Sequence, residues 1–173
     1  MPASYQPETR GDGDEQKSVS QSLETNLKAA ETTVRHILDQ KGGEVISIRP
    51  DATIGAAVEL LRDRKIGAVV VTDESGALTG ILSERDIVRR LADTPGQTLP
   101  QTVAELMTPD PQTCAPDESL VRLLRRMTDG RFRHMPVVEE GAMIGMVSIG
   151  DVVNFRLTAL EYEALQLKQL IVG

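Results

Sequence analysis

Two stretches of the chain decide its fold, because one repeats the pattern of the other. Residues 66–86 read IGAVVVTDESGALTGILSERD, and residues 133–151 read RHMPVVEEGAMIGMVSIGD. Each contains an apolar run, a short turn, a second apolar segment and the motif Gly-h-h-Ser-x-x-Asp, in which h is an apolar residue. An apolar run suits a strand that is covered on both faces, and turns of this length join β-hairpins. Each stretch therefore predicts a hairpin followed by a helix.

The repeat extends toward the N-terminus of each stretch. Asp86 lies 65 residues before Asp151, and the full units cover residues 44–91 and 111–157. Each unit predicts the order β-α-β-β-α, with first strands at 45–48 and 112–114, helix N-caps at Thr53 and Ser119, and final helices that begin at Glu84 and Gly150. One unit of about 50 residues buries too little surface to be stable alone. We therefore expect an α/β (α+β) fold in which the two tandem units pack in a pseudo-two-fold arrangement.

The other residues form a tail, a linker and an extension around the two repeats. Residues 1–18 are polar and are expected to be disordered, whereas residues 19–38 have weakly helical spacing. The chain is thus expected to divide into five parts. These are a tail (1–33), a first repeat (34–93), a linker (94–102), a second repeat (103–160) and a C-terminal helix extension (161–173).

Composition and charge exclude several classes of function. The chain has 26 acidic and 19 basic residues, a formal net charge of -7, which argues against a general nucleic-acid partner. Two Phe, two Tyr and no Trp imply an aliphatic core and disfavour binding of single strands by stacking. No apolar run approaches the roughly 20 residues of a membrane span, and no secretory signal is visible. The single cysteine, Cys114, fits a reducing compartment. We expect a cytoplasmic protein without a membrane partner.

The sequence carries no motif of catalysis or metal binding. Two histidines and one cysteine are too few for the usual zinc site, which takes about four such ligands at close spacing. No glycine loop ends in Lys-Ser or Lys-Thr, and a nucleophile elbow would need glycine where Met146 stands. We expect no catalytic residue and no metal ligand, and an enzyme is a hypothesis that no residue pattern supports.

The repeated Gly-h-h-Ser-x-x-Asp motif has two interpretations. Ser-x-x-Asp before an apolar helix is a capping box, which is a structural device. The motif occurs at the same place in both repeats, however, and its glycine lets another group approach the strand closely. A helix N-terminus favours anions, and the aspartate can accept hydrogen bonds from a ribose diol. The same aspartate can therefore cap the helix and bind a ligand.

These residues resemble a known family. IGAVVV with GILSERD in the first repeat, and ELMTPDP with RHMPVV in the second, are similar to paired cystathionine-β-synthase (CBS) domains, also called a Bateman module. The resemblance covers about residues 34–160. It implies a stand-alone regulatory module, not an enzyme, that binds an adenosine nucleotide (AMP, ADP, ATP or an NAD(H)-like molecule) in the cleft between the repeats. No further cofactor is implied, and the regulated protein is unknown.

The resemblance also implies roles for single residues. The ribose would be held by Ser83, Asp86, Ser148 and Asp151. The base would lie against Ile66, Gly67, Ala68, Thr113, His134, Met135 and Pro136. Phosphates would be met by Arg85, Arg131 and Arg133, because arginine forks match phosphate oxygens. Gly150 stands where the first repeat has Arg85, so the two sites are expected to differ, and one of them can stay empty.

Four structural alternatives stay open. RFRH at 131–134 can be a solvated turn with Phe132 tucked inward, and His134 can be a packed or surface histidine. The apolar residues after Val152 exceed what one packing stripe needs, which fits ordinary lobe packing or a homodimer contact. Finally, the whole chain can be a structural dimerisation or protein-interaction module without a physiological nucleotide.

Overall fold

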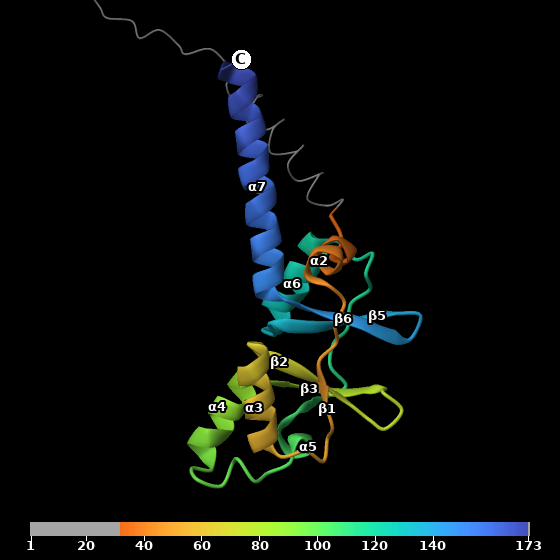
Figure 1. Ribbon diagram of the computed structural model, residues 1–173, viewed down its shortest axis with the longest axis vertical. Coiled ribbons are helices and arrows are strands. Elements are labelled where there is room, and N and C mark those ends of the chain that lie inside the picture. Colours follow the sequence, from red (N-terminus) through yellow and green to blue (C-terminus); the bar gives the residue numbers. More distant parts are fainter. Residues whose placement is uncertain (1–31, 173) are drawn as a thin grey trace, which may run out of the picture.

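The computed structural model describes residues 32–172, which form two lobes stacked along the long axis (Figure 1). The elements are α2 (Val34–Lys41), β1 (Ser47–Ile48), α3 (Ile54–Arg64), β2 (Ala68–Thr72), β3 (Leu78–Ser83), α4 (Glu84–Asp93), α5 (Val103–Leu106), β4 (Thr108–Pro109), α6 (Leu120–Gly130), β5 (His134–Glu139), β6 (Ala142–Ser148) and α7 (Ile149–Val172). The expected disorder at 1–18 and the start of the helix expected at 19–38 lie outside the described residues. None of the described helices is both long and apolar enough to cross a membrane.

The predicted hairpins are confirmed in both lobes. In the first lobe β2 pairs antiparallel with β3, with Ala68 opposite Ser83, and all five residues of β2 are buried. In the second lobe β5 pairs antiparallel with β6, with His134 opposite Ser148. The Ser-x-x-Asp motif of each repeat therefore lies where its hairpin ends and the next helix begins, which is α4 in the first lobe and α7 in the second.

The predicted N-caps of the middle helices are also confirmed. The Thr53 hydroxyl accepts a hydrogen bond from the Ala56 N–H at 3.2 Å. The Ser119 hydroxyl accepts one from the Arg122 N–H at 3.3 Å. Such bonds satisfy N–H groups that have no partner inside the helix. The two repeats thus begin α3 and α6 in the same way.

The first strands are shorter than predicted. β1 covers only Ser47–Ile48, parallel to β2. The strand predicted at 112–114 is wrong, because only Cys114 pairs there, in a parallel bridge to Val137. Pro116 has no N–H to donate at the next step of that ladder, so the pairing stops. Neither α5 nor β4 was predicted from the sequence. β4 extends the first sheet to the order β1-β2-β3-β4.

Each lobe is completed by a short helix from the other half of the sequence. α2 stands at the start of the first repeat, but its buried residues Val34, Ile37 and Leu38 join the core of the second lobe. α5 stands at the start of the second repeat, but Val103 joins the core of the first lobe. We call α2 and α5 the leading helices. The β-α-β-β-α units read along the chain and the packed lobes are therefore different sets of residues.

The glycine of the repeated motif makes room for the residues that each leading helix brings. A Cβ on Gly80 would lie 2.5 Å from the Met107 sulfur and 3.0 Å from the Thr108 carbonyl oxygen. A Cβ on Gly145 would lie 2.7 Å from Cδ2 of Leu38. The close approach expected at these glycines therefore occurs, but the approaching group is a side chain of this protein and not a ligand.

We expect Gly80→Ala to lower the free energy of unfolding by about 1–3 kcal/mol, because the added methyl group overfills a closed contact. Gly55→Ala is the matched control. Its Cβ would be 3.6 Å from the nearest neighbour, and alanine is the better helix former by about 1 kcal/mol. Denaturant unfolding of the two variants measures both effects. Equal stability of Gly80→Ala and the parent protein would contradict the packing role.

Candidate functional site

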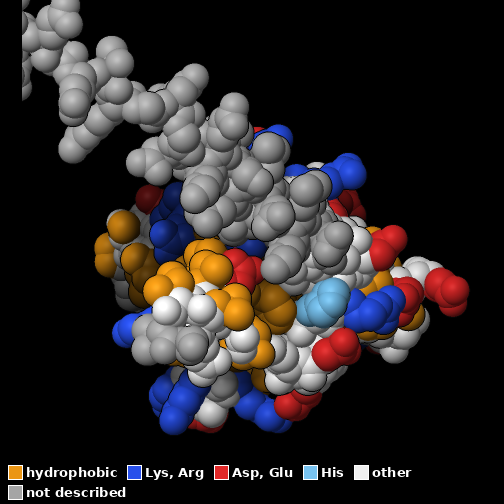
Figure 2. Space-filling view, turned by 90° about the horizontal axis from the view of Figure 1, so that it is seen from above, with side chains coloured by type: hydrophobic (Ala, Val, Ile, Leu, Met, Phe, Trp, Pro, Cys, Tyr) orange, Lys and Arg blue, Asp and Glu red, His pale blue; other side chains and the backbone are white. Residues whose placement is uncertain are grey.

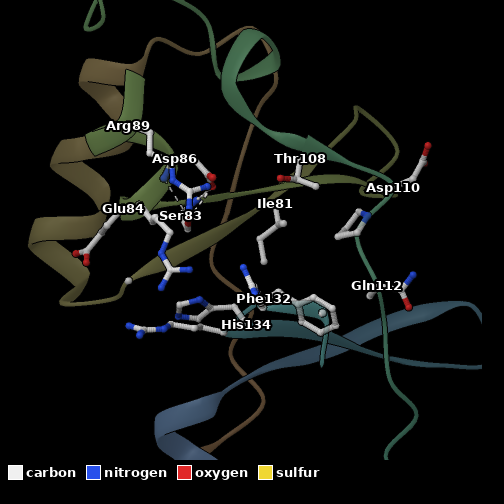
Figure 3. Close-up of a pocket in the computed structure, with 16 residues that line it drawn as sticks. Ile81, Ser83, Glu84, Asp86, Arg89, Thr108, Asp110, Gln112, Phe132 and His134 are labelled. Carbon is white, nitrogen blue, oxygen red and sulfur yellow. Dashed lines mark hydrogen bonds between the residues drawn. The ribbon is translucent and has the colours of Figure 1, made fainter. Parts of the chain in front are cut away.

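A cavity of about 620 Å³ lies between the two lobes. Figure 3 shows Ser83, Asp86 and Arg89 on its first-lobe side and Phe132 and His134 on its second-lobe side. The segment that crosses from one lobe to the other, 108–112, forms a third wall. The cavity therefore brings together the N-terminus of α4 and the start of β5, which are far apart in the sequence.

The carboxylate of Asp86 closes a capping box with Ser83 at one side of this cavity. Its Oδ2 accepts hydrogen bonds from the Ser83 N–H at 2.9 Å and from the Ser83 hydroxyl at 2.6 Å. The Asp86 N–H in turn points to Ser83 Oγ at 3.4 Å. Among the described residues Oδ1 has no such partner, so it can accept a hydrogen bond from a ligand. Both interpretations of the motif thus fit the first repeat.

Four arginines line the cavity, two on α4 and two beside β5: Arg85, Arg89, Arg131 and Arg133. All four are exposed, and among the described residues none of them forms an ion pair. Glu84, Asp86 and Asp110 are the acidic residues of the lining. Unpaired guanidinium groups that converge on a cavity favour a phosphate or another anion.

His134 lies over Gly67 of the first lobe. The strand registers place Ala68, opposite Ser83, as the counterpart of His134, opposite Ser148. A Cβ on Gly67 would be 3.5 Å from Cε1 and from Nε2 of the imidazole, so the two repeats touch here. Burial is the main cause that lowers the pKa of His134, and the charges of Lys41, Arg133 and Arg85 add to it, against an opposite effect of Asp151. The imidazole is therefore neutral at pH 7. His134 is therefore a packed histidine, as the structural interpretation expects, and it also lines the cavity, as the ligand-binding interpretation expects.

The motif of the second repeat lies in a different environment. Asp151 Oδ2 accepts hydrogen bonds from the Ser148 N–H at 2.8 Å and from Lys41 Nζ at 2.7 Å. Lys41 ends α2 and also donates to the Met146 carbonyl at 3.2 Å. Burial alone would raise the pKa of Asp151, but the hydrogen bonds and the charge of Lys41 outweigh it and lower the pKa. An amino group of the protein itself thus pairs with Oδ2 of the carboxylate that matches Asp86.

The structure separates the predicted site residues into two groups. Ser83, Arg85, Asp86, Arg131, Arg133, His134 and Gly67 line the interlobe cavity. The remaining seven do not: Ser148 and Asp151 lie at the start of α7, the side chains of Ala68, Met135 and Pro136 are buried, Ile66 packs against the first core, and the Thr113 carbonyl accepts a hydrogen bond from Arg126.

Sequence reasoning missed other residues of the lining. Arg89 follows Arg85 by one helical turn on α4, and this i, i+4 spacing was the available signal. Thr108 and Asp110 belong to the crossing segment, which gave no signal because β4 was not foreseen. Asp110 has a left-handed backbone (φ 46°), a conformation that aspartate tolerates better than most residues.

Comparison with known proteins places this architecture in a family. The CBS domain model matches residues 30–93 and 103–158. The mitochondrial CBS domain-containing protein CBSX3 of Arabidopsis thaliana is 36% identical over 131 residues, which cover 71% of this chain. The same match covers 64% of CBSX3, so the chain spans less than two thirds of that relative.

Solved structures agree with this match. A CBS-domain containing protein of Agrobacterium tumefaciens is 44% identical and superposes with a TM-score of 0.71, over 73% of this chain and 94% of that one. The CBS domain pair of protein MJ0100, solved in complex with 5′-methylthioadenosine and S-adenosyl-L-methionine, is 27% identical with a TM-score of 0.63, over 72% and 94%. The resemblance of the repeats and the predicted fold class are confirmed: the chain belongs to the CBS domain family and carries two tandem CBS repeats.

Proposed function

We propose that this protein is a non-catalytic regulatory module that binds an adenosine nucleotide in the interlobe cavity. The observation that carries the proposal is the convergence of four arginines, none of which forms an ion pair within residues 32–172, beside the Ser83–Asp86 capping box. A nucleotide presents a ribose diol and phosphates at a fixed separation, and the cavity presents an acceptor for the first and cations for the second. Bound nucleotide would bias the arrangement of the two lobes, which a partner protein can read.

The described geometry supports specific contacts. Oδ1 of Asp86 would accept a ribose hydroxyl, while Oδ2 keeps its cap. The base would lie between the lobes near Gly67 and His134, where the imidazole and Phe132 offer flat surfaces. The phosphates would lie toward Arg131 and the α4 arginines.

The ligands of a solved relative support an adenosine group in the ligand, but they do not support the presence of phosphate groups. The MJ0100 domain pair was solved with two adenosine-containing molecules, 5′-methylthioadenosine and S-adenosyl-L-methionine. Neither of those molecules carries a phosphate. The unpaired arginines of the present cavity are the reason to favour AMP, ADP or ATP here, because a guanidinium group gains most from an anionic partner.

We further propose that only the first repeat provides a working site. Lys41 forms an ion pair with Asp151 at Oδ2 and so neutralises the carboxylate that would hold the second ribose. Removing a charged partner from a half-buried carboxylate costs free energy, so an outside ligand would have to displace Lys41 first. A stoichiometry of one nucleotide per chain is expected.

The second candidate function is a structural interaction module without a nucleotide. The observation in its favour is that both Ser-x-x-Asp motifs already form helix caps within the protein. In that case, none of the cavity residues would affect the binding of any adenosine compound.

We expect Asp86→Ala to weaken nucleotide binding at least about tenfold, because it removes the ribose acceptor. Its cap is lost too, at about 1 kcal/mol of stability. Glu105→Ala is the matched control, since Glu105 accepts from the Thr102 N–H and hydroxyl at 2.7 and 2.9 Å in the same kind of capping box away from the cavity. Calorimetric titration with AMP, ADP, ATP and 5′-methylthioadenosine compares the two. Absence of binding by the parent protein would support the structural module instead.

Arg131→Gln should weaken binding of ATP several-fold and binding of 5′-methylthioadenosine little, because only the first carries phosphates. Arg125→Gln, on the exposed side of α6 and outside the cavity, is the control for loss of one positive charge. The same titrations at two salt concentrations measure the difference. Equal losses for both ligands would contradict a phosphate role for Arg131.

Lys41→Gln should open the second site. Asp151 then lacks its amino partner, and a second, weaker nucleotide is expected in the titration. Arg35→Ala is the control, because it removes another ion pair of α2, with Glu139, and leaves Lys41 in place. An unchanged stoichiometry in Lys41→Gln, with the protein folded by circular dichroism, would show that Lys41 does not close this site.

His134 should make nucleotide binding take up protons. Burial lowers its pKa below the ordinary 6.5 in the free protein, and the negative charge of a nucleotide bound in the same cavity would raise the pKa again. Between these two pKa values the bound state holds more protons, so affinity rises as the pH falls through that window. Titrations in buffers of different ionisation enthalpy measure the uptake, which should disappear in His134→Gln and persist in His36→Gln. Equal proton uptake by His134→Gln and the parent protein would contradict this role.

A further inference from the structure

Helix α7 has two apolar faces, and within the described part of the chain only one of them is packed. Val152 is fully buried in the core of the second lobe, and Phe155 packs against that core. The opposite face carries six exposed apolar residues at alternating steps of four and three: Val153, Leu157, Leu160, Ala164, Leu167 and Ile171. We call these six residues the α7 seam. A helix with two apolar faces needs two neighbours.

The seam stands clear of the lobes. Figure 1 shows that α7 leaves the second lobe after its first turns and projects along the long axis. Figure 2, seen from above, shows hydrophobic side chains gathered on this end of the molecule. The exposed fraction lies between 42% and 54% at Val153, Leu157, Leu160 and Leu167 and reaches 84% at Ile171. The projecting half of α7 therefore has few neighbours among the described residues.

The spacing of the seam is that of a coiled coil. Steps of four and three repeat every seven residues, with Val153, Leu160 and Leu167 at d positions and Leu157, Ala164 and Ile171 at a positions. Leucine at d is typical of parallel two-stranded coils. The pattern covers almost three heptads.

Charges beside the seam fit one orientation. In a parallel, in-register pair, a g residue of one helix faces the e residue five positions later on the other. Arg156 would then face Glu161 of the second copy, and Glu163 would face Lys168, so that each pair joins opposite charges. An antiparallel pair that overlaps the whole seam would instead place each Glu161 opposite the Glu161 of the second copy, and each Glu163 opposite the Glu163 of the second copy. Such like-charge contacts destabilise a coil.

We propose that the α7 seam binds a second copy of this chain as a parallel, in-register coiled coil. α7 is already helical and is anchored by its other face. Pairing therefore does not include the unfavourable free energy of helix nucleation, which weakens short isolated coiled coils. Both copies would then place their lobes at the same end of the coil. This dimer does not depend on nucleotide binding.

Leu167→Asp in the full-length chain tests the surface. Leu167 lies in the seam and Leu165 does not, yet their exposures are close, at 54% and 59%, so Leu165→Asp is the matched control. Sedimentation equilibrium should show a dimer for the parent protein and for Leu165→Asp. Leu167→Asp should raise the dissociation constant at least about tenfold, because it places a charge inside the seam. A monomeric parent protein, as expected if another part of the chain covers the seam, or an equal effect of both variants, would overturn the proposal.

Two further measurements test the orientation. Leu157→Cys and Ile171→Cys, made separately, should each form a disulfide-linked dimer under a mild oxidant, whereas an antiparallel pair can link at most one of them. Cys114 will not interfere, because it is 4% exposed and burial raises its pKa to about 12. Arg156→Glu should weaken the dimer, and Arg156→Glu with Glu161→Arg should restore it. Cross-linking at only one position, or no rescue by the double variant, would overturn the parallel orientation.

Discussion

Each hairpin of this protein depends on a side chain that arrives from the other half of the sequence. Met107 reaches the bare backbone at Gly80, and Leu38 reaches the bare backbone at Gly145. At these distances a side chain on either glycine would force the group that contacts it to shift. The two glycines thus leave the space in which Leu38 of α2, and Met107 directly after α5, pack against the hairpins.

The difference between the two Ser-x-x-Asp motifs follows from those leading helices. α2 covers eight residues and ends at Lys41, which reaches Asp151. α5 covers four residues and is followed by the crossing segment, which passes beside the first motif and brings Asp110 and not a lysine to the cavity wall. The two Ser-x-x-Asp motifs thus lie in different surroundings, which are set by residues outside the repeated motif.

The sequence was informative where a pattern is local. Apolar runs, turns and caps predicted β2, β3, β5 and β6 and the N-caps Thr53 and Ser119, because each depends on a few adjacent residues. The pairing of Ser83 with Asp86 as a capping box was also readable. The exchange of α2 and α5, the pairing of β4 with β3 and the amino group on Asp151 depend on contacts between distant parts of the chain, which spacing does not encode. The glycine of the motif was readable as a point of close approach, but the identity of the approaching group was not.

The exchanged helices also bear on how the molecule opens. When one lobe unfolds, the other lobe loses the helix that completes its core. Neither lobe can therefore unfold without exposing apolar residues of the other. Domains coupled in this way open as one cooperative unit, and amide hydrogens deep in β2 and β5 then exchange through the same global event. The contacts that enforce this join residues far apart in the chain, such as Leu38 and Gly145, and contacts of that kind slow folding. Cooperativity between the lobes is thus obtained at the expense of folding speed.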